Sequence, residues 1–418
     1  TILNTLNCYK NMQNYFTTIR SSAVNFTNFL KHYGFVTILT AQFFSSLADN
    51  ALLFAAIGIL KTLSAPDWQT PVLQQFFVFA YILLAPFVGP LADAFPKGRV
   101  MFLSNSVKFI GCIAMISGMY PLYAYSIVGI GAAIYSPAKY GILTECMPAE
   151  RLVWANGWME GLTVASIIAG TILGGILAFV ISPELALVII STFYLIAGFF
   201  NYYIPKLAPD HSLAQKTFIY ILHDFWNSFR GLWNDPLGQV SLAVTTLFWG
   251  VSATLRLVIL TWAGVALGLS LDQATQLTAL VAIGIAGGSV IAAKYIHLDH
   301  SVRVLPVGML MGIVVLSMAW VSQLAVAIAL LLVIGTLAGL FVVPMNALLQ
   351  HRGHLLMGAG HSIAVQNFNE NLAILGMLGI YAGMLKIDLS QSTIIFCFGM
   401  LVLVIMSILY RRHRHDQD

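Results

Sequence analysis

The stretch "GPLADAFPKGRV" at residues 89–100 decides the fold, because the chain carries it twice. It follows a long apolar run and combines a carboxylate, Asp93, with basic residues and a glycine. A weaker copy, "YIHLDHSVRVLP", occupies residues 295–306 and places Asp299 206 residues after Asp93. The two copies indicate an internal repeat, with one charged turn between apolar segments in each half.

Two further pairs of positions support the repeat. "SPAKYGILTE" in the first half is matched by "VPMNALLQHR" in the second, which places Pro344 207 residues after Pro137. Glu160 and Glu370 each lie near the start of the apolar segment that follows the proline. The offset divides the chain into two halves of similar length.

The composition places these halves in a membrane. The sequence is 59% hydrophobic and 9% charged, with a mean hydropathy of +0.86, whereas soluble domains carry about 25% charged residues. Its apolar runs of about 20 residues are long enough to cross a bilayer. We therefore expect an all-α polytopic membrane protein with twelve transmembrane helices in two six-helix pseudo-symmetric halves. The expected spans are 33–60, 71–94, 100–120, 121–143, 155–181, 185–204, 238–268, 276–298, 304–325, 326–349, 359–385 and 390–410.

The distribution of positive charge predicts the orientation. Most of the 20 basic residues fall on the side that holds both termini, and Lys61 and Lys386 fall on the other. An excess of Lys and Arg marks the cytoplasmic side of a membrane protein, so we expect both termini in the cytoplasm.

Two segments outside the spans have apolar residues at helical spacing. We interpret both as amphipathic helices on the cytoplasmic membrane surface; a solvated linker is the alternative. The expected organisation is an N-terminal amphipathic segment at 1–32, a six-helix half at 33–204, a linker with an amphipathic helix at 205–237, a second six-helix half at 238–410 and a cytoplasmic tail at 411–418.

Several classes of site are not indicated. The four cysteines are scattered, without a CxxC pair, and the histidines have no metal-ligand spacing. No GxxxxGK[ST] phosphate loop occurs, and the net charge of +4 does not suggest nucleic acid. We expect no cofactor, no metal site and no nucleic-acid partner.

An ionisable residue lies inside the first expected span, in "SSLADNALLF" at residues 45–54. A charge there costs at least about 2.5 kcal/mol, so it usually faces a cavity and has a partner. Adding the repeat offset of 207 to Asp49 gives Arg256, in the seventh span. Carboxylate and guanidinium together suit a ligand that carries a phosphate and an amine or a polyol. A structural salt bridge and a proton-relay carboxylate are the alternatives.

The charged turn itself suits a gate. Gly89, Asp93, Lys97, Gly98 and Arg99 match the loop signature of the major facilitator superfamily, whose two halves are parallel repeats with a substrate site between them. Its charges can pair across the cytoplasmic face in one state and separate in the other. A loop that only anchors the orientation is the alternative.

The resemblance to one family of that superfamily is more specific. Longer stretches between about residues 35 and 405 resemble the bacterial lysophospholipid transporter family. They are "AQFFSSLADNALLFAAIGILK", "FVFAYILLAPFVGPLADAFPKGRVM", "GIGAAIYSPAKYGIL", "TTLFWGVSATLRLVIL", "GLFVVPMNALLQ" and "GAGHSIAVQNFNENLAILGMLGIY". The resemblance implies import of lysophosphatidylethanolamine and lysophosphatidylglycerol from the outer to the inner leaflet of the bacterial inner membrane. A cytoplasmic acyltransferase/acyl-carrier-protein synthetase then reacylates them, and we expect that enzyme to be a separate protein.

The resemblance also assigns residues. Asp49 and Asn50 match the family's polar pair in the first span and Arg256 its arginine in the seventh, and we expect these three to bind the head group. A polar cluster at the start of the eleventh span either lines the cavity or satisfies a helix end. Its members are Gln366, Asn367, Asn369 and Glu370.

Two lysines lie within the expected spans. Lys139 matches the family's lysine in "SPAKYG", where it receives the phosphate during exit or pairs at the gate with Asp93 or Glu145. We expect Lys108 to extend to the membrane interface, as long cationic side chains do.

The predicted function is transport by alternating access without ATP, and not catalysis. Besides the lysophospholipid substrate, we expect contact only with membrane lipids and the separate reacylating enzyme. The alternative is a proton-coupled exporter of amphipathic drugs with Asp49 as its proton site. A non-transporting receptor or scaffold is disfavoured by the repeat and the gate loop.

Overall fold

A computed structural model describes residues 34–66, 69–205 and 217–415. The amphipathic segment expected at 1–32 lies outside the described residues. Six long helices precede the linker: α2 (Gly34–Thr62), α3 (Gln69–Ala94), α4 (Lys97–Ile116), α5 (Pro121–Cys146), α6 (Leu152–Ile176) and α7 (Pro183–Tyr202). The linker holds α8 (Phe218–Asn234). Six more follow: α9 (Pro236–Leu267), α10 (Leu271–Tyr295), α11 (Leu305–Ser317), α12 (Leu324–Leu356), α13 (Ala359–Lys386) and α14 (Gln391–His415).

The expected all-α membrane fold is confirmed. Each expected span overlaps one of these helices, with boundaries that differ by up to eight residues. Ten helical segments of the described chain are long and apolar enough to cross a membrane. The segments α5 and α13 are not among the ten, and both carry buried polar residues such as Lys139 and Glu370. The count of twelve crossings therefore stays a prediction.

Local sequence signals set several helix boundaries. Ser270 and Gln273 form a reciprocal capping box at the start of α10. Asp235 accepts a hydrogen bond from the backbone N–H of Gly238 (2.8 Å) and caps α9. Gly268 ends α9 with a φ of +65°, a conformation that glycine adopts without strain. Side-chain chemistry thus fixes where helices meet the connecting turns.

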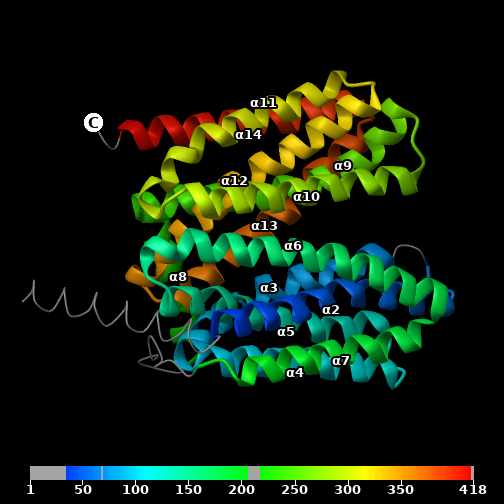
Figure 1. The fold of residues 1–418 in the computed structure, drawn as a ribbon, viewed down its shortest axis with the longest axis vertical. Helices are drawn as coiled ribbons and strands as arrows, with labels where there is room; N and C mark the ends of the chain where they lie inside the picture. The colour runs from blue at the N-terminus through cyan, green and yellow to red at the C-terminus, as the bar shows by residue number, and fades with distance from the viewer. Residues whose placement is uncertain (1–33, 67–68, 206–216, 416–418) are drawn as a thin grey trace, which may run out of the picture.

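The helices form two groups, which Figure 1 shows one above the other. In the first, α2 packs on α6 and α7, and α4 packs on α5 and α7. In the second, α10 packs on α12, α11 on α14 and α9 on α13. Between the groups, α3 packs against α13 and α6 against α10. Helices α5 and α12 also reach the opposite group, where they contact α13 and α6 respectively.

One end of this bundle holds the α3–α4 turn, the α5–α6 turn, the α12–α13 turn and α8, and we call it the gate end. Helix α8 contacts α3 of the first group and α9, α12 and α13 of the second. It has a strongly amphipathic sequence, and its exposed apolar residues include Phe218, Ile219, Leu222 and Trp226. The linker helix therefore bridges both groups at this end.

Two glycines allow α3 and α13 to approach closely at the gate end. A Cβ atom on Gly360 would lie 2.6 Å from the backbone oxygen of Gly89 and from Asp93 Oδ1. A Cβ on Gly89 would lie 3.0 Å from the Cα of His361. Backbone atoms on the opposing helix cannot move aside as a flexible side chain can, so a larger residue at Gly360 must separate the helices.

We expect Gly360→Ala to loosen the gate end. The measurement is the rate at which a soluble maleimide labels Ser136→Cys, a buried position on α5, in an otherwise cysteine-free protein. Labelling should be several-fold faster with Gly360→Ala. Gly161→Ala is the control, because nothing lies within 4 Å of a Cβ built there. Equal labelling rates in both backgrounds would show that the helices tolerate the methyl group.

Candidate functional site

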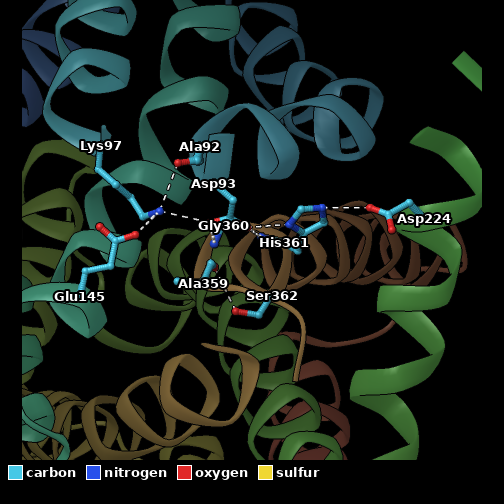
Figure 2. Close-up of polar contacts among 9 residues, drawn as sticks. All are labelled: Ala92, Asp93, Lys97, Glu145, Asp224, Ala359, Gly360, His361 and Ser362. Atoms are coloured by element: carbon cyan, nitrogen blue, oxygen red, sulfur yellow. Dashed lines mark hydrogen bonds and ion pairs between the residues drawn. The ribbon is translucent and has the colours of Figure 1, made fainter. Parts of the chain in front are cut away.

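The carboxylate of Asp93 joins the two halves at the gate end. Its side chain is fully buried at the end of α3. It accepts hydrogen bonds from the backbone N–H groups of Gly360 (2.7 Å) and His361 (3.0 Å) at the start of α13. Figure 2 shows this contact. The first turn of a helix offers unpaired N–H donors and a positive dipole end, so α13 can bind a carboxylate that has lost its water.

Lys97 neutralises this site from the first half. Its Nζ lies 3.1 Å from Asp93 Oδ1, 3.1 Å from the backbone oxygen of Ala92 and 2.5 Å from Glu145 Oε1. The ammonium group is therefore shared between the α3 and α5 carboxylates, as Figure 2 shows. Arg99 has an exposed side chain and lies apart from these contacts.

The gate-signature glycines serve packing. Gly98 lies against α7, where a Cβ atom would come within 2.9 Å of Ile204 Cβ. Gly89 lies against α13, as described above. The signature thus combines two kinds of residue. Its charged residues form ion pairs, and its glycines permit close contact between helices.

His361 extends the network to the linker helix. Its Nδ1 lies 2.6 Å from Asp93 Oδ2, and its Nε2 lies 2.9 Å from Asp224 Oδ2 on α8. The imidazole thus bridges two carboxylates from different elements (Figure 2). Sequence reasoning missed this role, because a single histidine beside a glycine carries no recognisable spacing.

Aromatic contacts and a second ion pair also hold α8. Phe225 and Phe229 pack edge-on against Phe368 of α13. At the C-terminal end of α8, Arg352 of α12 pairs with Asp235. The Arg352 hydrogen bond holds the pKa of Asp235 below its usual range, so this pair persists into acidic pH. Helix α8 is therefore held to the second half along its middle and at its C-terminal end.

Within the first half, Asp49 has a different partner from the expected one. The expectation that Arg256 pairs with it is wrong. Asp49 Oδ2 lies 2.7 Å from Lys108 Nζ of α4, and Asp49 Oδ1 accepts a hydrogen bond from Tyr194 of α7 (2.7 Å). The Asp49 side chain remains 23% exposed. Both oxygens are thus engaged inside one half while part of the carboxylate stays accessible.

The expectation that Lys108 extends to the interface is also wrong. Its side chain is 1% exposed. It lies eleven residues after Lys97, the first residue of α4, which is about 16 Å along the helix axis. That distance exceeds the length of a lysine side chain. Because Asp49 pairs with the Lys108 ammonium inside the bundle, the side chain does not need to reach the membrane interface.

The other two expected head-group residues lie on separate helices. Asn50 is half-buried on α2 and donates a hydrogen bond to the backbone oxygen of Ser46 (2.8 Å). Arg256 lies on α9 with an exposed side chain. The Asp49 carboxylate instead contacts Lys108 through one oxygen and Tyr194 through the other.

Lys139 is buried on α5 and does not form the gate pair that was one of its two expected roles. Lys97 takes both Asp93 and Glu145 instead. The Lys139 ammonium lies 4.0 Å from the ring centre of Tyr140, whose hydroxyl donates to Glu160 (2.7 Å). The role left open for Lys139 is contact with a substrate.

The polar cluster of α13 lies buried between the halves. Gln366 donates to Glu370 Oε1 (2.7 Å) and to Asn346 of α12 (2.9 Å). Asn367 donates to Ser136 of α5 (2.9 Å), and Asn369 bonds back to its own helix. These side chains do more than satisfy a helix end, because one of them crosses between the halves.

A second crossing bond joins the pair of helices that the repeat relates to the first pair. Asn156 of α6 and Gln350 of α12 exchange two hydrogen bonds of 2.8 Å each. The α5–α13 and α12–α6 contacts are equivalent under exchange of the halves. Within the described ranges, no group of three or more His, Cys, Asp or Glu residues could hold a metal ion. The arrangement places polar side chains of both halves against one another.

Comparisons with known proteins agree with this geometry. A sequence profile described as the Major Facilitator Superfamily matches residues 38–375. The lysophospholipid transporter LplT of Yersinia pestis (strain Pestoides F) is 47% identical over 356 residues, 84% of this chain and 87% of that protein. LplT of Yersinia pseudotuberculosis serotype I (strain IP32953) matches with the same values.

Similar structures establish the fold alone. They include the human organic anion transporter MFSD10, with a TM-score of 0.69 and 15% identity over 91% of this chain and 98% of that one. They also include a bacterial homologue of the iron transporter ferroportin in an outward-facing state, with a TM-score of 0.71 and 15% identity over 91% and 99%.

The bridge from His361 to α8 is testable by hydrogen–deuterium exchange. Asp224→Ala removes a partly exposed ion pair, which stabilises by up to about 1 kcal/mol. Amides in the first turns of α8 should therefore exchange several-fold faster. Asn227→Ala, an exposed position on the same helix, is the control. Identical exchange in the two variants would assign the position of α8 to its aromatic contacts and the Arg352–Asp235 pair.

Proposed function

The chain belongs to the lysophospholipid transporters of the major facilitator superfamily, and from this we propose that it moves lysophospholipids across the bacterial inner membrane. The substrates are chiefly lysophosphatidylethanolamine and lysophosphatidylglycerol, carried from the outer to the inner leaflet. The observation that carries the proposal is 47% identity to LplT over 84% of the chain. Buried charged residues inside the membrane helices, which mark transport pathways, support it.

The gate end faces the cytoplasm in this proposal. The basic residues of the connecting turns gather there, as the distribution of Lys and Arg predicts. The ion pairs and backbone hydrogen bonds of Asp93 hold the two halves together at this end. The structure thus corresponds to a state closed to the cytoplasm, and substrate enters from the opposite side.

The head group binds between the halves. The partly exposed carboxylate of Asp49 and the amide of Asn50 receive an ammonium or hydroxyl group from one side. The guanidinium of Arg256 receives the phosphate from the other, because its planar fork matches phosphate oxygens. The acyl chain stays against lipid or apolar helix faces, since only the head group needs a polar path.

Exit to the cytoplasm uses the polar side chains that lie buried between the halves on α5 and α13. Opening of the gate end breaks the bonds of Asn367 to Ser136 and of Gln350 to Asn156. Lys139, Gln366 and Glu370, which are buried now, then become accessible to the phosphate and amine. Rocking of the halves requires no ATP. Reacylation by a separate acyltransferase/acyl-carrier-protein synthetase consumes the product and maintains the gradient.

The test uses purified protein in phosphatidylcholine liposomes and lysophosphatidylethanolamine labelled on its acyl chain. Dithionite quenches label in the outer leaflet, so the protected fraction reports movement. We expect rapid protein-dependent movement without an ion gradient. Arg256→Ala should slow it at least about tenfold, because a charge-assisted phosphate contact is lost, and Arg256→Lys should retain part of the rate.

The control is Arg411→Ala, an exposed arginine at the end of α14, which should match the wild type. Unchanged movement with Arg256→Ala would contradict the head-group assignment. Movement that requires an imposed proton gradient and stops with a protonophore would favour a proton-coupled exporter of amphipathic compounds.

A further inference from the structure

The buried ammonium of Lys108 occupies a built cationic site inside the first half. It donates to Asp49 (2.7 Å) and to the hydroxyl of Ser45 (3.1 Å), and Ser45 in turn donates to Asn105 (2.8 Å). It also lies 4.8 Å from the ring centre of Tyr135. Carboxylate, hydroxyl and aromatic face are the groups that recognise a free ammonium ion.

Packing fixes the position of this ammonium group. The stem of Lys108 runs past Gly131 of α5, where a Cβ atom would come within 2.7 Å of Lys108 Cγ. The Lys108 side chain is 1% exposed, and its ammonium lies 2.7 Å from Asp49 Oδ2. A buried cation without its partner is strongly unfavourable. Lys108 and Asp49 therefore act as one electrically neutral unit whose accessible edge is the carboxylate.

We propose that Lys108 is the residue that determines head-group specificity, because it occupies the place of a substrate ammonium at Asp49 and cancels its charge. This inference rests on the proposed function. A bare carboxylate in the pathway would favour head groups that carry a cation and repel anionic ones. The neutral pair instead leaves lone pairs that accept hydrogen bonds from either kind of head group.

The two expected substrates differ in this respect. A phosphoethanolamine head is zwitterionic, and its ammonium can donate to the exposed edge of Asp49. A phosphoglycerol head is anionic, and its hydroxyl groups can donate to the same edge, provided that no net negative charge faces its phosphate. One site then serves both head groups, and the charge of Lys108 makes this tolerance feasible.

The experiment measures initial rates for lysophosphatidylethanolamine and lysophosphatidylglycerol with the same labelled acyl chain, in the liposome assay described above. Neutral liposomes avoid electrostatic enrichment of either substrate. Lys108→Met exposes an uncompensated carboxylate and should raise the ratio of ethanolamine to glycerol rates about tenfold. Asp49→Asn leaves Lys108 uncompensated and should lower the ratio by a similar factor.

The double variant Asp49→Asn/Lys108→Met removes both charges and should return the ratio to within about threefold of the wild type. The double variant also keeps the test informative if a single variant misfolds, because it leaves no unpaired buried charge. Tyr194→Phe is the matched control, since it removes a hydrogen bond from Asp49 without changing the charge. It should lower both rates and leave their ratio unchanged.

The outcomes separate this inference from the proposed function. If the wild type moves neither lysophospholipid, the proposed function fails. If the wild type moves both, but single and double variants have the wild-type ratio, the pair is a structural clamp and the inference is overturned. Opposite shifts in the two single variants, cancelled in the double variant, would establish it.

Discussion

The binding of a dehydrated carboxylate by a helix N-terminus is the interaction on which this structure depends. Asp93 is fully buried, and it finds its hydrogen-bond donors on the other half of the molecule, at Gly360 and His361. The bond is available only when α3 and α13 are close enough for a carboxylate to reach backbone N–H groups. Separation of the helices returns Asp93 to water, which compensates for the lost bonds. Such an interaction can hold a gate without making it permanent, because solvent replaces the protein donors when the gate opens.

The same constraint acts deeper in the membrane helices, where water does not replace a lost partner so readily. Lys108 lies about three helical turns from the gate end of α4, and it and Asp49 of α2 neutralise one another within a single half. A pair inside one half moves with it as a rigid unit, so its energy stays constant while the halves rock. Under the proposed function, the contacts that break and reform are those of the charges at the gate end, and the Asp49–Lys108 pair persists. This division allows a large movement without exposing a buried charge to lipid.

Much of this architecture could be predicted from the sequence, and the exceptions have a common cause. The apolar runs located the helices, and the charged turn singled out Asp93, because both signals are local in the sequence. The partner of Asp49 was predicted from the repeat offset, which connects equivalent positions in different halves. The true partner, Lys108, is a neighbour in the same half, and helix rotation rather than chain position decides that contact. His361 and Asp224 were missed for a related reason, since their contact joins the linker helix to α13 and depends on how the helices pack.

The two copies of the repeated turn differ in the environment of their carboxylates. Asp299 occupies the position in the second half that Asp93 occupies in the first, on the short helix η3 (Leu298–Val304), yet its side chain is exposed. The segment η3 packs against η1 (Ala149–Arg151), which precedes α6, so the two copies meet equivalent neighbours. The first copy meets the free N–H groups of α13, whereas the second meets a helix already preceded by a 3₁₀ turn. A 3₁₀ turn consumes donors that a helix start otherwise offers. Of the two repeat-related carboxylates, only Asp93 is buried, and the linker helix reaches it through His361.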